Sequence, residues 1–177
     1  MRTVRRARTT RAPRFGRWLE RAKESGAESA KIIRPDSVVT AAWVRLKCQY
    51  GCGGWGGCLT CPPHSPTPQQ TRAVLDCYKT ALLVHGGDHV DLSKTVAALE
   101  REIFLAGYYK ALAFGCGPCR LCRECNLDDC AHPREARPSM EAAGIDVYAT
   151  ARGNGYPLEV VKDHSCPTNY YGLVLIE

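Results

Sequence analysis

The chain has 177 residues, with 24 Lys and Arg against 18 Asp and Glu, and a formal net charge of +6. This length suits a single domain, and the 45% share of hydrophobic residues is ordinary for a globular protein. No apolar run is long enough to cross a bilayer, and the N-terminus lacks the apolar stretch of a secretory signal. We therefore expect a cytoplasmic protein with no membrane partner.

The positive charge is concentrated at the N-terminus. Residues 1–23 hold nine Lys or Arg and one acidic residue, Glu20, so the rest of the chain is slightly acidic. We predict a disordered basic tail over residues 1–14 and a single iron–sulfur domain over residues 15–177. A body of this charge gives no electrostatic reason to expect a nucleic-acid partner.

Short helices and short apolar strands alternate along the body of the chain. Apolar residues at helical spacing and capping residues predict helices over residues 15–25, 67–78, 91–109 and 138–144. Apolar and β-branched runs predict strands over residues 37–47, 80–86, 111–115, 145–150 and 172–177. This order predicts an α/β or α+β fold, with a small sheet, flanking helices and two cysteine-rich cluster-binding loops.

The main signal is the cysteine content, which is eleven residues in this short chain. Nine of them lie in two windows, Cys48–Cys61 and Cys116–Cys130. Only Cys77, on a helix where we expect it in the core, and Cys166 stand apart. Because cytosolic thiols are kept reduced and an odd number fits disulfides poorly, this clustering indicates metal.

The second window has three successive C-x2-C steps followed by a more distant cysteine. This spacing is typical of ferredoxin-like [4Fe–4S] ligands, whereas zinc sites usually join two separated cysteine pairs. We predict a cluster held by Cys119, Cys122, Cys125 and Cys130, with Cys116 able to replace one of them. Zinc is the less favoured metal.

The first window contains Cys48, Cys52, Cys58 and Cys61 in a stretch rich in glycine. Glycine lets backbone N–H groups approach sulfur without obstruction by side chains. We predict a second [4Fe–4S] cluster here, and the alternative is a flexible loop with zinc or free thiols.

Three stretches of the chain resemble the DUF2284 family of predicted metal-binding proteins. They are KCQYGCGGWGGCLTCPPHSPTP, LEREIFLAGYYKALAFGCGPCRLCREC and HPREARPSMEAAGIDVYAT, and the likeness covers about residues 40–177. The resemblance implies two ligand sets, Cys48, Cys52 and Cys61 in the first window and Cys119, Cys122, Cys125 and Cys130 in the second. Cys58 and Cys116 depart from the family pattern, which leaves open whether the first cluster has three or four protein ligands.

The sequence leads to three functional hypotheses. The first is electron transfer by two [4Fe–4S] clusters to a redox partner protein, since this requires only the cysteines. The second is an iron–sulfur oxidoreductase or sulfur-handling enzyme, with a small-molecule substrate at an open iron of the first cluster. The third is a zinc-stabilised interaction module. The sequence indicates no catalytic residue, reaction or oligomeric state.

Overall fold

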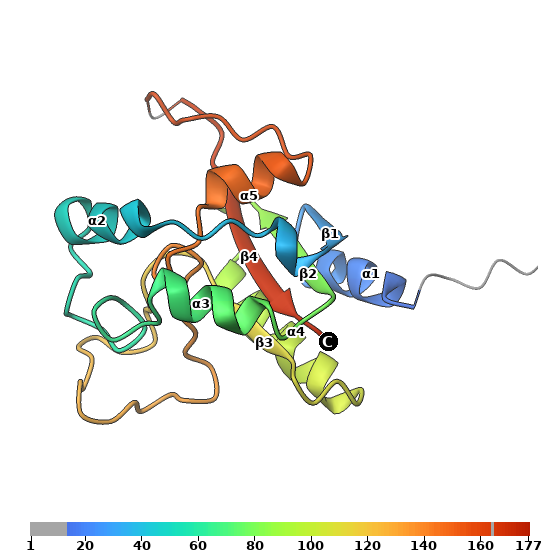
Figure 1. Ribbon diagram of the computed structural model, residues 1–177, viewed down its shortest axis with the longest axis horizontal. Helices are drawn as coiled ribbons and strands as arrows, with labels where there is room; N and C mark the ends of the chain where they lie inside the picture. The colour runs from blue at the N-terminus through green and yellow to red at the C-terminus, as the bar shows by residue number, and fades with distance from the viewer. Residues whose placement is uncertain (1–13, 164) are drawn as a thin grey trace, which may run out of the picture.

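The centre of the molecule is a four-stranded antiparallel sheet with the strand order β1-β2-β4-β3 (Figure 1). The structure is a computed structural model, which describes residues 14–163 and 165–177. The strands are β1 (Ser29–Ile33), β2 (Ala81–Gly86), β3 (Leu112–Phe114) and β4 (Tyr170–Leu175). The described residues also form five α-helices, α1 (Gly16–Glu24), α2 (Ala42–Gly51), α3 (Pro68–Leu75), α4 (Leu92–Leu105) and α5 (Val147–Gly153), and a 3₁₀ helix, η1 (Pro35–Ser37). The fold is therefore α+β, which is one of the two fold classes predicted from the sequence.

The two central strands bury both of their faces. Leu82 of β2 is paired with Val174 of β4, and both belong to the hydrophobic cluster that includes residues of α1 and α4. Leu83 is paired with Leu173, and these two side chains belong to the opposite cluster, which includes residues of α3 and α5. Since side chains alternate along a strand, one short sheet separates two cores. A Cβ on Gly172 would lie 2.7 Å from the side chain of Val96, so glycine is needed here for α4 to pack this closely.

Most of the elements that pack on the sheet are confirmed at their predicted positions. They are α1, α3, α4, β2, β3 and β4. The helix starts also follow from the sequence: Thr67 and Gln70 form a capping box at α3, and Asp91 accepts a hydrogen bond from the Lys94 amide at α4.

The strand predicted over residues 37–47 is wrong, because α2 begins at Ala42. The extended part stops at Thr40, which forms an isolated bridge with Ile145. The β-branched residues that suggested a strand lie mostly before this point, and Val44 is the only one inside α2. From Ala42 onward, residues with good helix propensity prevail.

Three other predictions for single elements or residues are also wrong. Residues 145–150 were expected as a strand but begin α5, since the Asp146 carboxylate accepts from the Ala149 amide at 2.9 Å and caps a helix. Residues 138–144 form a single turn and no helix. Cys77 is exposed at the end of α3 and does not lie in the core. Strand β1, which lies at one edge of the sheet, was not predicted.

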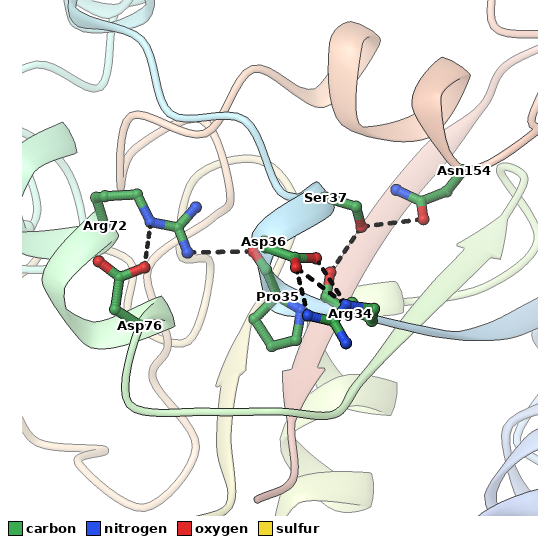
Figure 2. A network of polar contacts seen from close by, with 7 residues as sticks. All are labelled: Arg34, Pro35, Asp36, Ser37, Arg72, Asp76 and Asn154. Atoms are coloured by element: carbon green, nitrogen blue, oxygen red, sulfur yellow. Dashed lines mark hydrogen bonds and ion pairs between the residues drawn. The ribbon is translucent and has the colours of Figure 1, made fainter.

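A polar network fixes the segment that leads from β1 to α2 (Figure 2). Arg72 of α3 forms an ion pair with Asp76 at 2.8 Å and donates to the Pro35 carbonyl at 3.2 Å. Ser37 donates to the side-chain oxygen of Asn154, which follows α5, at 3.1 Å. This segment is therefore tied to both helices before the chain enters α2.

The predicted basic tail lies outside the described residues except for Arg14, which forms an ion pair with Glu177 at 2.8 Å. In the part of the chain that the structure describes, no helix has the length and apolar character needed to span a membrane.

An ion pair joins α4 to the segment that follows the second cysteine window. Arg137 donates from Nε to the Oε2 atom of Glu100 at 2.6 Å and from Nη2 to its Oε1 atom at 2.5 Å. The side chains are only 18% and 12% exposed, and Glu100 also accepts from the Ala113 amide of β3 at 2.6 Å. Bidentate pairing of this kind is among the stronger side-chain contacts.

Replacing Glu100 by Gln should lower the free energy of unfolding by about 3 kcal/mol, because Arg137 would keep its charge without a carboxylate partner. Denaturation in urea would measure this. Asp36→Asn, in the exposed pair with Arg34, is the matched control and should have a much smaller effect. Equal losses in the two variants would contradict the structural role of the Glu100–Arg137 pair.

Candidate metal centre

The first cysteine window begins in a helix and continues into a compact loop. Cys48 lies in the last turn of α2, and Cys52 is the residue that ends this helix. The loop then folds back on itself, since the Gly56 amide donates to the Pro62 carbonyl at 2.8 Å and the Cys61 amide donates to the Cys58 carbonyl at 2.9 Å. These turns bring the late cysteines of the window back toward the end of α2.

The second window forms a long loop whose two ends are held together. It leaves β3, and the Gly115 amide donates to the Pro138 carbonyl at 2.8 Å, while the Met140 amide donates to the Gly115 carbonyl at 3.0 Å. Residues 117–131, all of which the structure describes, make no backbone–backbone hydrogen bond. Loops of this length without secondary structure are uncommon in compact domains and are usually functional.

Two thiols of the first window, those of Cys52 and Cys61, lie beside Gly54, and we call these two, together with Cys48 in the last turn of α2, the Gly54 site. A Cβ on Gly54 would lie 3.5 Å from the Cys61 sulfur and 3.6 Å from the Cys52 sulfur. The Gly54 amide also donates to the Cys52 sulfur at 3.4 Å. Burial, followed by the charge of Cys52, raises the pKa of Cys48.

The second group of thiols lines a cavity of about 260 Å³, which we call the cavity site. Its cysteines come from both windows and are Cys58, Cys119, Cys122, Cys125 and Cys130. This volume is below the roughly 300–1,000 Å³ of most sites for organic ligands. Its size and its sulfur donors suit a small inorganic group.

Cys58 is the residue that links the two windows. Burial opposes its ionisation, but hydrogen bonds from Thr60 and from the thiols of Cys125 and Cys119 outweigh burial and lower the pKa of Cys58. Sequence reasoning grouped Cys58 with the first window, whereas the structure brings it to Cys119 and Cys125. The only feature of the sequence that set Cys58 apart from the other cysteines of the first window was its absence from the family pattern.

The two sites are neighbours. Burial, followed by the charges of Cys58, Cys52 and Cys48, raises the pKa of Cys61 to about 11. Cys58 and Cys61 belong to the same tight turn, and each belongs to a different site. In Figure 1 the loop that follows α2 and the loop that follows β3 run alongside each other, which is consistent with the cavity that they share.

The remaining cysteines lie elsewhere. Cys116 packs against the core beneath α1 and α4, and its amide donates to the Ser93 hydroxyl at 3.0 Å. Cys166 lies near Asp163, with 3.8 Å between its sulfur and the carboxylate. Neither residue lines the cavity site.

The sequence did not single out Glu141, a partly buried residue with one buried carboxyl oxygen. Burial raises the pKa of Glu141, and its Oε2 atom is buried without a hydrogen-bond partner among the described residues. Glu141 lies in a stretch that carries the family resemblance, but no role was predicted for the charged residues of this stretch. Nothing in the sequence marked Glu141 as buried.

A larger cavity of about 890 Å³ adjoins the cavity site, with which it shares Cys119, Leu121 and Ala136. Its lining includes Arg101, Arg120 and Arg134, none of which forms an ion pair within the described residues. Asp88 and Asp91 also line it. The cationic side chains make this cavity suitable for an anion.

The donor chemistry fits a thiolate-bound metal centre. Thiolates are soft ligands, which suit iron–sulfur clusters and zinc, and the glycine at position 54 leaves space between two of them. Within residues 14–163 and 165–177, no three His, Cys, Asp or Glu side chains are grouped as they would be around one metal ion.

The molecule is thus an α+β protein whose loops gather thiols at two adjacent sites. The family model of predicted metal-binding proteins, DUF2284, matches residues 31–176, and the chain belongs to this family. This confirms the family resemblance seen in the sequence. No curated protein and no solved structure matches the chain.

The Gly54 site can be tested with a single methyl group. Gly54→Ala should lower the metal content of this site, because the new Cβ would lie in contact with the Cys52 and Cys61 sulfurs and occupy space that a metal bound to them would need. Gly53→Ala is the control, since a Cβ there would have no atom within 4 Å. Metal analysis of the two purified variants would check this, and equal metal contents would contradict the assignment.

Proposed function

We propose that this protein binds two [4Fe–4S] clusters, one at the Gly54 site and one at the cavity site, and transfers electrons between partner proteins. The observation that carries the proposal is the gathering of thiols from both windows around one small cavity, with the Cys52 and Cys61 thiols beside Gly54 in the same loop. When bound, such clusters would accept and release single electrons. The protein would hold them, shield them and set their potentials.

The loop of the second window supports a cluster as the group that orders it. Residues 117–131 have no backbone ladder of their own, and their four cysteines are spaced for one cubane. A bound cluster would supply four covalent links between parts of this loop. Metal binding and loop ordering would then be coupled.

The first window supports a cluster by its backbone donors. The N–H of Gly54 already points at the Cys52 sulfur, and hydrogen bonds to ligand sulfur are one of the means by which proteins adjust cluster potential. The shared turn of Cys58 and Cys61 would keep the two clusters close, as rapid electron exchange between them requires.

Anaerobic purification followed by iron, sulfide and zinc analysis would test the proposal. We expect about eight irons and eight acid-labile sulfides per chain, since each cubane holds four of each. EPR of the reduced protein should show two interacting clusters because the sites are adjacent. Stoichiometric zinc without labile sulfide would contradict the proposal and favour the zinc-stabilised interaction module.

The cavity site offers five thiols for the four ligand positions of a cubane. We expect Cys58 and Cys130 to replace each other, so that each single change to Ser keeps about eight irons per chain. Changing both should remove about half of the iron, because only three of the five thiols would remain for a cubane. Iron analysis and EPR would check these variants.

Loss of the cluster in Cys130→Ser alone would show that Cys58 is no substitute ligand. Loss of the cluster in Cys58→Ser alone would show that Cys130 cannot replace Cys58 as a ligand. Retention in the double variant would contradict the assignment of both residues to this site.

A second candidate function is a redox enzyme acting on a small anion. The cationic cavity of about 890 Å³ favours it, since this cavity adjoins the cavity site and is large enough for an organic substrate. This function also requires an iron with an exchangeable ligand. It therefore depends on what fills the fourth position of the Gly54 site.

A further inference from the structure

Helix α2 leaves most of its apolar side chains in solvent. Val44 is its only buried residue. Trp43, Leu46 and Tyr50 are 49%, 55% and 81% exposed. Figure 1 shows α2 at the margin of the molecule, away from the sheet. This helix therefore contributes little to either hydrophobic core.

The three exposed side chains share one face of the helix, and we call Trp43, Leu46 and Tyr50 the α2 stripe. They are separated by three and four residues, and positions with this spacing are neighbours on a helix surface. Single exposed apolar residues are ordinary, whereas a continuous group with two aromatic side chains is typical of a protein–protein contact surface. A ten-residue helix that packs so little is marginally stable by itself, so a partner on this face would stabilise it.

The charge around the α2 stripe has one sign. Residues 37–75, which include α2 and the first cysteine window, contain three Lys or Arg and no Asp or Glu. Lys47 is exposed. Arg45 donates to oxygens of Ser65 and Pro66 and forms no ion pair within the described residues. A partner with acidic side chains around an apolar patch would complement this surface.

Two other occupants fit the α2 stripe less well. In a twofold-symmetric contact with a second copy, the same surface lies on both sides, so each Lys47 would face a region without a carboxylate. Helices that lie on membranes have polar faces rich in Lys and Arg, whereas Lys47 is the only exposed cationic residue of α2. The charge of this face therefore favours an acidic protein.

The α2 stripe leads directly to the first cysteine window. Cys48 lies in the last turn of α2, and Cys52, which is exposed, ends this helix two residues after Tyr50. A protein that covered Tyr50 would therefore lie beside the loop of the first window.

We propose that the α2 stripe is the docking surface for a small acidic electron-carrier protein. This inference rests on the proposed function, which makes the loop of the first window a place where electrons enter or leave. The apolar and aromatic side chains would supply most of the affinity, and Lys47 would attract the partner and speed its association. Contacts between electron-transfer proteins are small, so one helix and the adjoining loop are sufficient.

Flavodoxin, a small acidic electron carrier, serves as the probe, with the basic protein cytochrome c as the charge control. Titration calorimetry at low salt should show flavodoxin binding that weakens as salt is added, and no binding of cytochrome c. Trp43→Ser and Lys47→Glu should each weaken the binding about tenfold or more. Both side chains are exposed, so neither change should unfold the chain.

The matched controls are changes of the same kind at other exposed positions. Leu105, at the end of α4, is 70% exposed, and Leu105→Ser should bind flavodoxin as the parent does. Lys79→Glu, which makes the same charge change before β2, should also leave the binding unchanged. Absence of flavodoxin binding, or equal binding by Trp43→Ser and the parent, would overturn the proposal.

Two further measurements test the other occupants. A dimer in sedimentation velocity that Leu46→Ser dissociates would show that a second copy covers the α2 stripe, and would overturn the proposal. Binding to phosphatidylglycerol vesicles that Trp43→Ser abolishes would show a membrane contact and would also overturn it. Calorimetry needs no cluster signal, so the proposed function can fail separately: if the chain holds zinc without sulfide, flavodoxin binding lost in Trp43→Ser would still support the α2 stripe as the docking surface.

Discussion

The turn formed by residues 139–145 determines where both cysteine windows lie. Its backbone receives hydrogen bonds from the hydroxyls of Ser65 and Thr71 at 2.6 Å each and from the Ala41 amide at 2.9 Å, and it bonds to Gly115 at the end of β3. The loop of the first window, α3, the entrance to α2 and the start of the second window are thus all attached to one short segment. Because buried carbonyls need partners, each of these bonds would be costly to lose.

The sheet and the loops have different sources of order. The strands and helices are stabilised by two hydrophobic clusters that lie on opposite faces of the sheet. The loop of the first window has many glycines, and residues 117–131 of the second window have no backbone ladder. Glycine loses more backbone entropy on folding than other residues do, so these loops need stabilisation that the sheet does not supply. Thiolate–metal bonds are a source of the required size.

Cys58 and Cys61 lie in one short turn, but they belong to different sites. Cys61 lies with Cys52 beside Gly54, and Cys58 lies with the loop of the second window. The two sites would then differ in chemistry, since five thiols, Glu124 and His132 line the cavity site, whereas the Gly54 site has only thiols of the first window. Such a difference would give two neighbouring clusters different potentials and different access to small ligands.

The sequence by itself determined the fold class, most of the packed helices and strands, and the family. Apolar spacing and capping residues carry that information locally, as Thr67 and Asp91 illustrate. It also indicated a metal-binding protein, because cysteine spacing is visible along the chain. The grouping of Cys58 with Cys119 and Cys125, and the burial of the Glu141 Oε2 atom, were decided only by the tertiary structure. Spacing constrains which thiols of one segment can converge, but it contains no information on which segments meet or which carboxylate loses its water when they do.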